Sequence, residues 1–519
     1  MSDFFHKNMI IDYFKSIISQ NFGFVPTREQ EEAIDSLARF VLQCTEEEAQ
    51  SAAYFHRSLF LLRGYAGTGK TSLIGALVKT MIMLERQCVL LAPTGRAAKV
   101  FSLYASHPAY TIHKRIYRQK SIEIDSPFSL DFNSMKHTLF IVDEASMINN
   151  EASMDLYDSS GVQRHTFNRG MLLDDLLEFV YSGEGCRLIV LGDTAQLPPV
   201  GAMESPALQP EILSGYGYNV IHHTLTQVVR QTEESNILTN ATTLRSMISD
   251  GITEGIRPEI QFGHDVVNVT GNELIETLSH CYHEYGTDDT IVICRSNKRA
   301  NIYNNGIRTQ ILDRESELSS GDIIMIAKNN YYWLSRSNSA EEAIRHTETN
   351  TGEDPHGNTA AYSAPFLANG DIARVNRVRN EREFYGFRFA DVELTLPDYD
   401  DMEIEATVLL DTLHSESPSL TREQSELLYN RVLEDYMDIP HKHERLKKLK
   451  EDPYYNALQI KYAYAVTCHK AQGGQWSQVF IDEGYITPDM IGIDYYRWLY
   501  TAVTRATNKI YLVNWKKSE

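Results

Sequence analysis

A glycine-rich segment at residues 64–71 constrains the fold of this chain more than any other feature. It reads GYAGTGKT and fits the pattern G-x-x-x-x-G-K-[ST]. Residues 59–62 before it form an apolar run typical of a buried strand, and apolar residues after it recur at helical spacing. Backbone N–H groups of such a loop close around phosphate oxygens, and the following helix presents its N-terminus to negative charge. The segment therefore predicts a nucleoside triphosphate site.

The loop itself supplies most of the residues that we expect to hold the triphosphate. Lys70 would reach the β- and γ-phosphates, and the Thr71 hydroxyl would bind Mg²⁺. The remaining expected nucleotide-binding residues of this segment are Gly64, Ala66, Gly67, Thr68, Gly69 and Ser72. A chance glycine-rich turn is the alternative, and the flanking strand and helix argue against it.

Length, charge and cysteine usage narrow the class of protein. A chain of 519 residues is too long for one core and suggests about three or four domains. The net charge of −21 argues against a generally basic nucleic-acid coat, but a local basic groove can bind a strand on an acidic body. The six cysteines are scattered without a C-x-x-C pair, which is typical of a reducing compartment and predicts no zinc site. With no long apolar run and no signal-peptide layout, we expect a soluble cytoplasmic protein without membrane contact.

Two further apolar runs end in polar residues that phosphoryl transfer needs. Residues 138–142 lead into Asp143 and Glu144 at the carboxyl end of a predicted strand, where ligands collect in open α/β sheets. Asp143 suits the Mg²⁺ shell, and Glu144 suits the orientation of a water. Residues 187–192 lead into a loop with Gln196, whose amide can sense a γ-phosphate without changing charge. An exposed pair of acids in a turn is the alternative for the carboxylates.

The order of the predicted elements indicates two α/β units and an inserted β region. Apolar strands such as residues 59–62, 88–94, 138–142 and 187–192 alternate with helices, which predicts a doubly wound parallel sheet. A second α/β unit begins near residue 290 and continues near the end of the chain. Between its halves, short strands with Asn-Gly turns suggest a small barrel. Residues 336–360 are predicted to be a long mobile loop, and residues 420–450 a charged helical stretch with a solvated basic face.

A small insertion at residues 119–133 changes the hydrophobic period. Ile122 and Ile124 alternate with polar residues before a turn, and Phe128 and Phe132 continue the alternation after it, which is a β-hairpin signature. The apolar face of this hairpin is too small to be stable alone, so it must pack on another part of the protein. A hairpin that only packs on its own domain and one with a working role are both consistent with the pattern.

Two polar positions have both a structural and a functional explanation. Thr27 would cap a helix, and Gln30 three residues later would complete a capping box. Thr94 follows an apolar strand and opens a helix that could hold a phosphate of a bound strand, with Arg96 adding positive charge. Pro-Thr-Gly after a strand is also common turn chemistry.

Taken together, these motifs resemble the ordered motif set of the superfamily 1 helicases, specifically the RecD-like and Dda-like branch. The resemblance covers most of the chain. The matching positions are Gln30 and residues 64–71, 92–99, 111–113, 143–146, 192–199, Arg230, 369–371, 467–473 and 500–505. The resemblance implies an α/β fold of two RecA-like P-loop cores, each a parallel sheet flanked by helices, with ATP at their interface.

The resemblance also implies roles for individual residues. The second core would supply Arg230 and Arg505 to the γ-phosphate, where an arginine stabilises charge that develops in the transition state. Gln30 would contact adenine, and Thr71 and Asp143 would hold Mg²⁺. The implied catalytic set is Lys70, Asp143, Glu144, Gln196, Arg230 and Arg505. The implied strand-binding set is Thr94, Arg96, His113, Pro198, Thr467, His469, Phe128 and Phe132.

The resemblance further implies the division of the chain. The first core would comprise residues 1–113 and 138–225, with a hairpin insert at 114–137 that separates strands. The second core would comprise residues 226–320 and 455–519, with an SH3-like β insert and helical extension at 321–454. Phe128 or Phe132 would stack on a base at the fork, because aromatic stacking tolerates any sequence.

The predicted function is that of an ATP-dependent DNA helicase that moves 5′ to 3′ on single-stranded DNA and unwinds duplex. Its cofactors would be ATP and Mg²⁺, and its substrates single strands and single-strand/duplex junctions. We expect a monomeric motor with possible replication or repair partners. A translocase or motor subunit of a nuclease complex without unwinding activity is one alternative. A nucleotide-dependent DNA-binding switch or relaxase is another, and the residues alone do not distinguish DNA from RNA.

Overall fold

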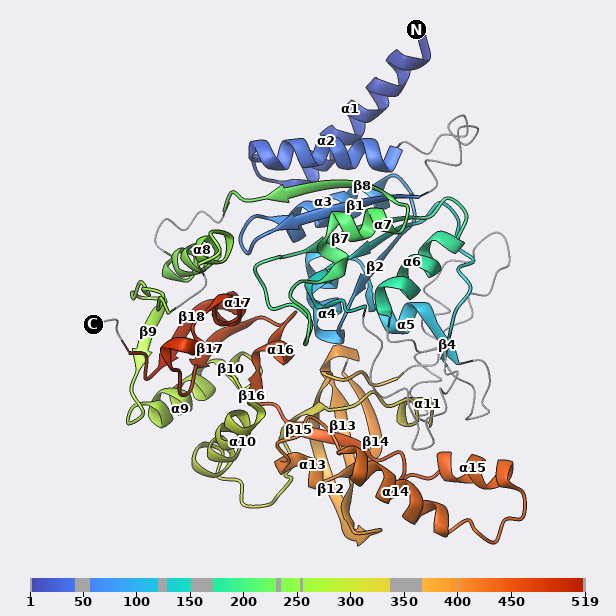
Figure 1. Cartoon of the computed structure of the whole chain (residues 1–519), viewed down its shortest axis with the longest axis vertical. Helices are drawn as coiled ribbons and strands as arrows, with labels where there is room; N and C mark the ends of the chain where they lie inside the picture. The colour runs from blue at the N-terminus through green and yellow to red at the C-terminus, as the bar shows by residue number, and fades with distance from the viewer. Residues whose placement is uncertain are drawn as a thin grey trace.

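The structure is a computed structural model, which describes residues 2–42, 57–119, 128–150, 171–229, 235–252, 255–336, 366–399 and 401–516. Two α/β cores lie side by side, and a β-barrel packs below them, while the N-terminal helices cover the far end of the first core (Figure 1). Within these ranges, no helix combines the length and the apolar character that a membrane span needs.

The first core is built on a six-stranded parallel sheet with the strand order β3-β2-β6-β7-β1-β8. Phe60 and Leu62 of β1 point to one face, where they pack with the N-terminal helices and the helix after the glycine loop, whereas Leu59 and Leu61 point to the other face. Both faces are therefore buried, as expected for a parallel sheet. The strands are β1 (Ser58–Gly64), β2 (Cys88–Ala92), β3 (Ala109–Thr111), β6 (Leu139–Val142), β7 (Arg187–Gly192) and β8 (Asn219–Leu225).

Helices on both faces of this sheet complete the first core. The apolar side of the helix that follows the glycine loop, including Leu73, Leu77 and Met81, is fully buried. The helices are α1 (Ser2–Phe22), α2 (Arg28–Leu42), α3 (Lys70–Met83), α4 (Gly95–Ala105), α5 (Ile112–Ile116), α6 (Leu172–Ser182) and α7 (Pro210–Gly215), with short turns η2 (Ala145–Met147) and η4 (Pro206–Leu208).

The second core has a five-stranded parallel sheet with the order β16-β10-β17-β18-β9. Its strands are β9 (Val266–Val269), β10 (Thr290–Cys294), β16 (Ala465–Thr467), β17 (Trp476–Asp482) and β18 (Ala506–Val513). Its helices are α8 (Asn236–Ser249), α9 (Leu274–Tyr285), α10 (Asn297–Gly306), η5 (Ile307–Ile311), α16 (Cys468–Ala471), η7 (Pro488–Met490) and α17 (Ile493–Val503). The two parallel sheets confirm the predicted fold class of two RecA-like cores.

The insert in the second core is a closed barrel of five strands. The strands are β11 (Ile323–Ile326), β12 (Ile372–Phe384), β13 (Phe387–Leu396), β14 (Met402–Leu409) and β15 (Leu458–Tyr462). The predicted boundary at residue 454 is wrong in one respect, since β15 belongs to the barrel and not to the second core. Strand β15 pairs with both β11 and β14, and this closure leaves neither of them as an open edge.

Short helices surround the barrel: α11 (Trp333–Arg336), η6 (Pro397–Tyr399), α13 (Asp411–His414), α14 (Arg422–Glu434) and α15 (Lys442–Lys450). The charged helical stretch is not only a solvated face. Leu428, Val432 and Leu449 of α14 and α15 pack against Phe387 and Phe389 of the barrel. The predicted mobile loop lies, from residue 337 onward, outside the described residues.

The predicted hairpin is present as two antiparallel strands, β4 (Tyr117–Gln119) and β5 (Phe128–Leu130). Its base is held by a hydrogen bond of 2.6 Å from the Tyr117 hydroxyl to Asp175 of α6. Ile122 and Ile124 lie outside the described residues. The base of the hairpin is thus packed on the first core, as its small apolar face requires.

Candidate functional site

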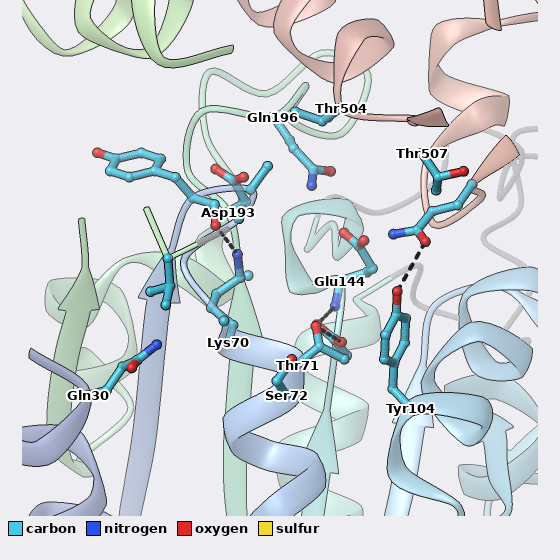
Figure 2. A pocket seen from close by; sticks show the side chains of 18 of the residues that line it. Gln30, Lys70, Thr71, Ser72, Tyr104, Glu144, Asp193, Gln196, Thr504 and Thr507 are labelled. Atoms are coloured by element: carbon cyan, nitrogen blue, oxygen red, sulfur yellow. Dashed lines mark hydrogen bonds between the residues drawn. The ribbon is translucent and has the colours of Figure 1, made fainter. Parts of the chain in front are cut away.

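A cavity of about 460 Å³ lies between the carboxyl ends of the first core's strands and the second core (Figure 2). It brings together most of the residues predicted to bind nucleotide and to act on it. The predicted residues that line it are Gln30, Ala66, Gly67, Gly69, Lys70, Thr71, Ser72, Asp143, Glu144, Gln196 and Arg505. Gly64 and Thr68 belong to the same loop without lining the cavity, and Thr68 is fully buried beneath it.

The glycine loop adopts a conformation that requires glycine. Gly67 and Gly69 have φ values of +79° and +81°, in the left-handed region that side chains disfavour. A Cβ atom on Gly69 would also lie only 2.8 Å from Nε2 of Gln30. Lys70 folds back over the loop, and its ammonium donates hydrogen bonds to the carbonyl oxygens of Gly64 and, at 3.0 Å, Tyr65. Phosphate oxygens would replace these carbonyls as partners of the ammonium.

Gln30 makes the capping contacts that the sequence predicted, and it also contacts the glycine loop. Its Oε1 accepts from the Thr27 N–H at 2.9 Å, and its own N–H donates to the Thr27 hydroxyl at 3.3 Å, which completes the predicted capping box. Its Nε2 donates to the Thr68 carbonyl at 2.9 Å. Gln30 therefore ties the start of α2 to the glycine loop, and its contact with adenine stays a prediction.

The carboxylate pair lies beside the end of the loop. The Asp143 Oδ2 is 3.4 Å from the Thr71 hydroxyl, and Oδ1 accepts from the Glu144 N–H at 2.7 Å. Burial, and then the neighbouring Glu144 carboxylate, raise the pKa of Asp143 to about 6, although Lys70 opposes this shift. A hydroxyl and a carboxylate side by side fit Mg²⁺, which prefers oxygen ligands and would favour the ionised carboxylate.

Glu144 and Gln196 have the features of residues held for function. Glu144 has φ +53° and ψ +38°, a left-handed conformation that costs free energy in a residue other than glycine. Gln196 is almost fully buried, and its Oε1 accepts no hydrogen bond from any described group. A buried acceptor without a donor is costly, so the amide oxygen suits a water or ligand that enters the cavity.

Arg505 reaches this site from the second core. Its side chain is only 5% exposed, and Nη1 lies 3.9 Å from Oε1 of Glu144 in the first core. Hydrogen bonds from Nε to the Thr501 carbonyl and from Nη1 to the Gly474 carbonyl hold the guanidinium in place. Arg230 lies outside the described residues, so its predicted role is not tested.

Several residues of the cavity wall carry no sequence signal. The hydroxyl of Tyr104 in α4 lies 3.4 Å from Oε1 of Gln475 in the second core, as Figure 2 shows by a dashed line. Thr504 and Thr507 face the cavity from the same side. Three apolar residues also line the cavity: Phe22, Phe24 and Val25. Nothing distinguishes these residues in the sequence, because they meet only through the packing of separate elements.

A second cavity, of about 190 Å³, lies where the two cores and the barrel meet, and Thr94, Arg96 and His469 line it. The guanidinium of Arg96 stacks 4.0 Å from the ring centroid of Trp476. Two glycines allow this approach of the cores. A Cβ atom on Gly473 would lie 2.6 Å from the Ala97 Cβ, and one on Gly474 would clash with Trp476.

The other predicted strand-binding residues do not all meet there. Thr94 caps α4 through its hydroxyl, as turn chemistry predicts. His113, Pro198 and Thr467 do not line this cavity. Burial lowers the pKa of His113 to about 4, so its imidazole is neutral near pH 7. Phe132 is 70% exposed beside the hairpin, and the side chain of Phe128 lies outside the described part of the structure.

Comparison with known proteins gives one family match in each core. Residues 46–202 match the AAA domain family, and residues 462–513 match the UvrD-like helicase C-terminal domain family. An uncharacterized protein of Acanthamoeba polyphaga mimivirus is 23% identical over 514 residues, which covers 87% of this chain and 94% of that protein.

Solved structures of helicases also match this chain over most of its length. Pif1 helicase from Bacteroides, in complex with ADP-AlF3 and ssDNA, is 14% identical, and the match covers 96% of this chain and 94% of that one with a TM-score of 0.44. Pif1 helicase from Candida albicans is 15% identical, with coverage of 95% on both sides and a TM-score of 0.42. The two family matches lie in the order that the predicted motifs have along the chain, and they support the resemblance of this chain to the superfamily 1 helicases.

Proposed function

We propose that this chain is an ATP-driven DNA helicase that moves 5′ to 3′ on single-stranded DNA and unwinds duplex. The observation that carries the proposal is the position of Arg505. This arginine of the second core faces Glu144 of the first core at 3.9 Å, across the cavity that holds the predicted ATP-binding residues. A site completed by two cores couples ATP binding to their relative position, which is what a motor requires.

Each side chain of the cavity would have a separate role in ATP hydrolysis. Lys70 would hold the β- and γ-phosphates, and Thr71 and Asp143 would hold Mg²⁺, which would neutralise charge on the phosphates. Glu144 would orient and deprotonate the attacking water, and the unpaired oxygen of Gln196 would accept one of its hydrogen bonds. Arg505 and Arg230 would stabilise charge on the γ-phosphate in the transition state.

The second cavity supports the proposed path of the strand. Arg96 of the first core, His469 of the second core and the backbone near Gly370 of the barrel meet around it. A shift of one core relative to the other would change the distance between the surfaces that hold the strand. Closure around ATP would therefore advance the strand, and hydrolysis would reopen the cores.

The hairpin and the barrel support unwinding and membership of the Dda-like branch. The barrel docks on the first core near the hairpin through Lys99, whose ammonium lies 3.6 Å from Asp398, and Lys114, 5.8 Å from the ring centroid of Tyr399. A hairpin whose surroundings are fixed in this way can stand against a duplex, with Phe132 exposed beside it. The remaining domain boundaries, the monomeric state and a cytoplasmic role in replication or repair belong to the same proposal.

Unwinding of tailed duplexes by the purified chain tests the proposal. With ATP and Mg²⁺, a duplex with a 5′ single-stranded tail should be opened, whereas the same duplex with a 3′ tail should stay closed. Opening of the 3′-tailed duplex alone would reverse the direction.

The alternative is a translocase, or a motor subunit of a nuclease complex, that has no unwinding activity of its own. It predicts ATP hydrolysis stimulated by single-stranded DNA without opening of either tailed duplex. A matching RNA strand in the same assay would show whether the motor distinguishes DNA from RNA, since a 2′-hydroxyl is the chemical difference between them.

A further inference from the structure

One hydroxyl group joins the two cores at the glycine loop. Tyr500 lies in α17 of the second core and is only 1% exposed. Its hydroxyl accepts a hydrogen bond of 2.9 Å from the backbone N–H of Ala66, in the middle of the glycine loop. The same hydroxyl donates a hydrogen bond of 2.7 Å to Oδ2 of Asp193, directly after β7. The phosphate-binding loop and the loop that carries Gln196 are thus both attached to one side chain of the other core.

The chemistry of the three groups fits this double contact. Burial raises the pKa of Tyr500 well above its usual value, so the phenol keeps the proton that it donates. Asp193 is also buried, and its other oxygen accepts from the Ala195 N–H at 3.0 Å. Without the hydroxyl, the Ala66 N–H and one oxygen of a buried carboxyl would both lose their partner.

Two neighbouring bonds fix α17 and the end of α16 against the loop that follows β7. The Thr501 hydroxyl accepts from the Leu197 N–H at 2.8 Å, and Nε2 of Gln472 donates to the Leu197 carbonyl at 2.7 Å. These two bonds hold the loop that follows β7, whereas the bond of Tyr500 reaches the glycine loop as well. Of these three residues, Tyr500 is therefore the one that bonds to the glycine loop, through the Ala66 N–H.

The lengths of the two bonds make the contact sensitive to the separation of the cores. A hydrogen bond of this kind is lost once donor and acceptor are more than about 3.5 Å apart. A displacement of α17 by roughly 1 Å from the first core would therefore break both bonds. The glycine loop is held by Tyr500 only while the cores are close together.

We propose that Tyr500 is a positioning residue through which the second core holds the glycine loop in the geometry needed for ATP hydrolysis. The inference rests on the proposed function, in which closure of the cores drives hydrolysis. Tyr500 itself touches no reacting atom in this scheme. It acts through the Ala66 N–H and through Asp193, and so makes turnover depend on the position of α17.

The test is Tyr500→Phe in the full-length chain, with Tyr496→Phe as the matched control. Tyr496 lies in the same helix and is equally buried, but its hydroxyl donates to the Ile256 carbonyl within the second core. At saturating single-stranded DNA, Tyr500→Phe should lower kcat for ATP by about tenfold, the size expected for the loss of a hydrogen bond to a charged group. The KM for ATP should stay within about twofold, because Lys70 and the other phosphate-binding side chains are unchanged. The control should keep the wild-type kcat.

Hydrogen exchange of the glycine loop provides a readout that does not need turnover. Without nucleotide, the amide of Ala66 should exchange faster in Tyr500→Phe than in the wild type and in Tyr496→Phe. Equal exchange in all three proteins would overturn the inference, as would a kcat of Tyr500→Phe equal to that of the control. If the wild type hydrolysed no ATP, the proposed function would be wrong, and the exchange comparison would still decide whether Tyr500 holds the loop.

Discussion

The two α/β cores contribute to the nucleotide cavity in different ways. The first core presents Lys70, Asp143 and Gln196 from loops that directly follow its parallel strands, so its own fold sets their spacing. The second core presents Tyr500 from the last turn of α17 and Arg505 from the turn that follows it, and both have partners in the first core. The first core thus places the predicted nucleotide-binding residues by its own fold, whereas the second contributes to the cavity only when the cores are in contact.

The largest effects are expected from the first core. Glu144→Gln and Lys70→Ala should each abolish DNA-stimulated ATP hydrolysis, because the water then lacks its base or the phosphates lack their ammonium. Both variants should still bind single-stranded DNA, as measured by fluorescence anisotropy without nucleotide, since neither residue lines the cavity at the barrel. Normal turnover in either variant would refute the assignment of the site.

A separation of catalysis from binding is expected in the second core. Arg505→Ala should lower kcat by about a thousandfold, the lower range for an arginine that stabilises a phosphoryl transition state. Binding of a fluorescent ATP analogue should change little, because Lys70 and the loop remain. Lys509→Ala, in β18 of the second core and outside the cavity, is the control and should keep its turnover. Equal losses of binding and turnover in Arg505→Ala would remove the distinction between the cores.

An intermediate effect is expected at the hairpin, which belongs to neither sheet. Phe132→Ala should lower the rate of duplex unwinding by about tenfold, which is the size of one lost base–aromatic stack, and Phe128→Ala in addition should lower it further. ATP hydrolysis on single-stranded DNA should stay unchanged, because the cores are intact. Tyr485→Ala removes an aromatic ring that is 83% exposed elsewhere and serves as the control. A parallel fall of both activities would argue against a strand-separating hairpin.

The smallest effect is expected where the barrel meets the first core. Asp371 is buried beside Gly95 and accepts hydrogen bonds from the Tyr399 hydroxyl and the Ala368 N–H. Burial raises the pKa of this carboxyl to about 7, with Asp398 adding to the shift and Lys114 opposing it. Since the unfolded carboxyl titrates near 4, ionisation is disfavoured in the folded state.

The sign of the pH dependence follows from that shift. Wild type should lose stability relative to Asp371→Asn as pH rises from about 4 to 7, and the difference should be constant above pH 7. Thermal unfolding at pH 5 and pH 8 should show a difference in Tm of a few degrees that is larger at pH 8. Asp401→Asn controls for the change in net charge. A difference that is the same at both pH values would contradict the raised pKa.

The features that could be predicted from the sequence are those set by neighbouring residues. The glycine loop, the strand before it and the carboxylates after residue 142 follow a local pattern in which strand, loop and helix are consecutive. The capping box of Thr27 and Gln30 is another example, because both partners lie within one turn. The hairpin could be recognised from its alternation for the same reason.

The features that could not be predicted depend on segments far apart in the chain. Strand β15 joins the barrel by pairing with β11 and β14. The sequence of its five residues does not distinguish it from a strand of the second core. The second bond of Gln30, to the Thr68 carbonyl, requires α2 to pack beside the glycine loop. Residues of the cavity wall such as Tyr104 become part of a site only through such packing.

The sequence by itself predicted a triphosphate site between parallel strands and helices, because a phosphate-binding loop is a local structure. The order of its motifs, through the resemblance that it carries, was sufficient to predict two cores and an arginine of the second core at the cavity. Only the tertiary structure decided which side chains join the cores. Tyr500 and Ala66 are 434 residues apart, and their hydrogen bond exists because α17 lies against the loops that follow β1 and β7 of the first core. The spacing of residues along the chain cannot predict such a contact.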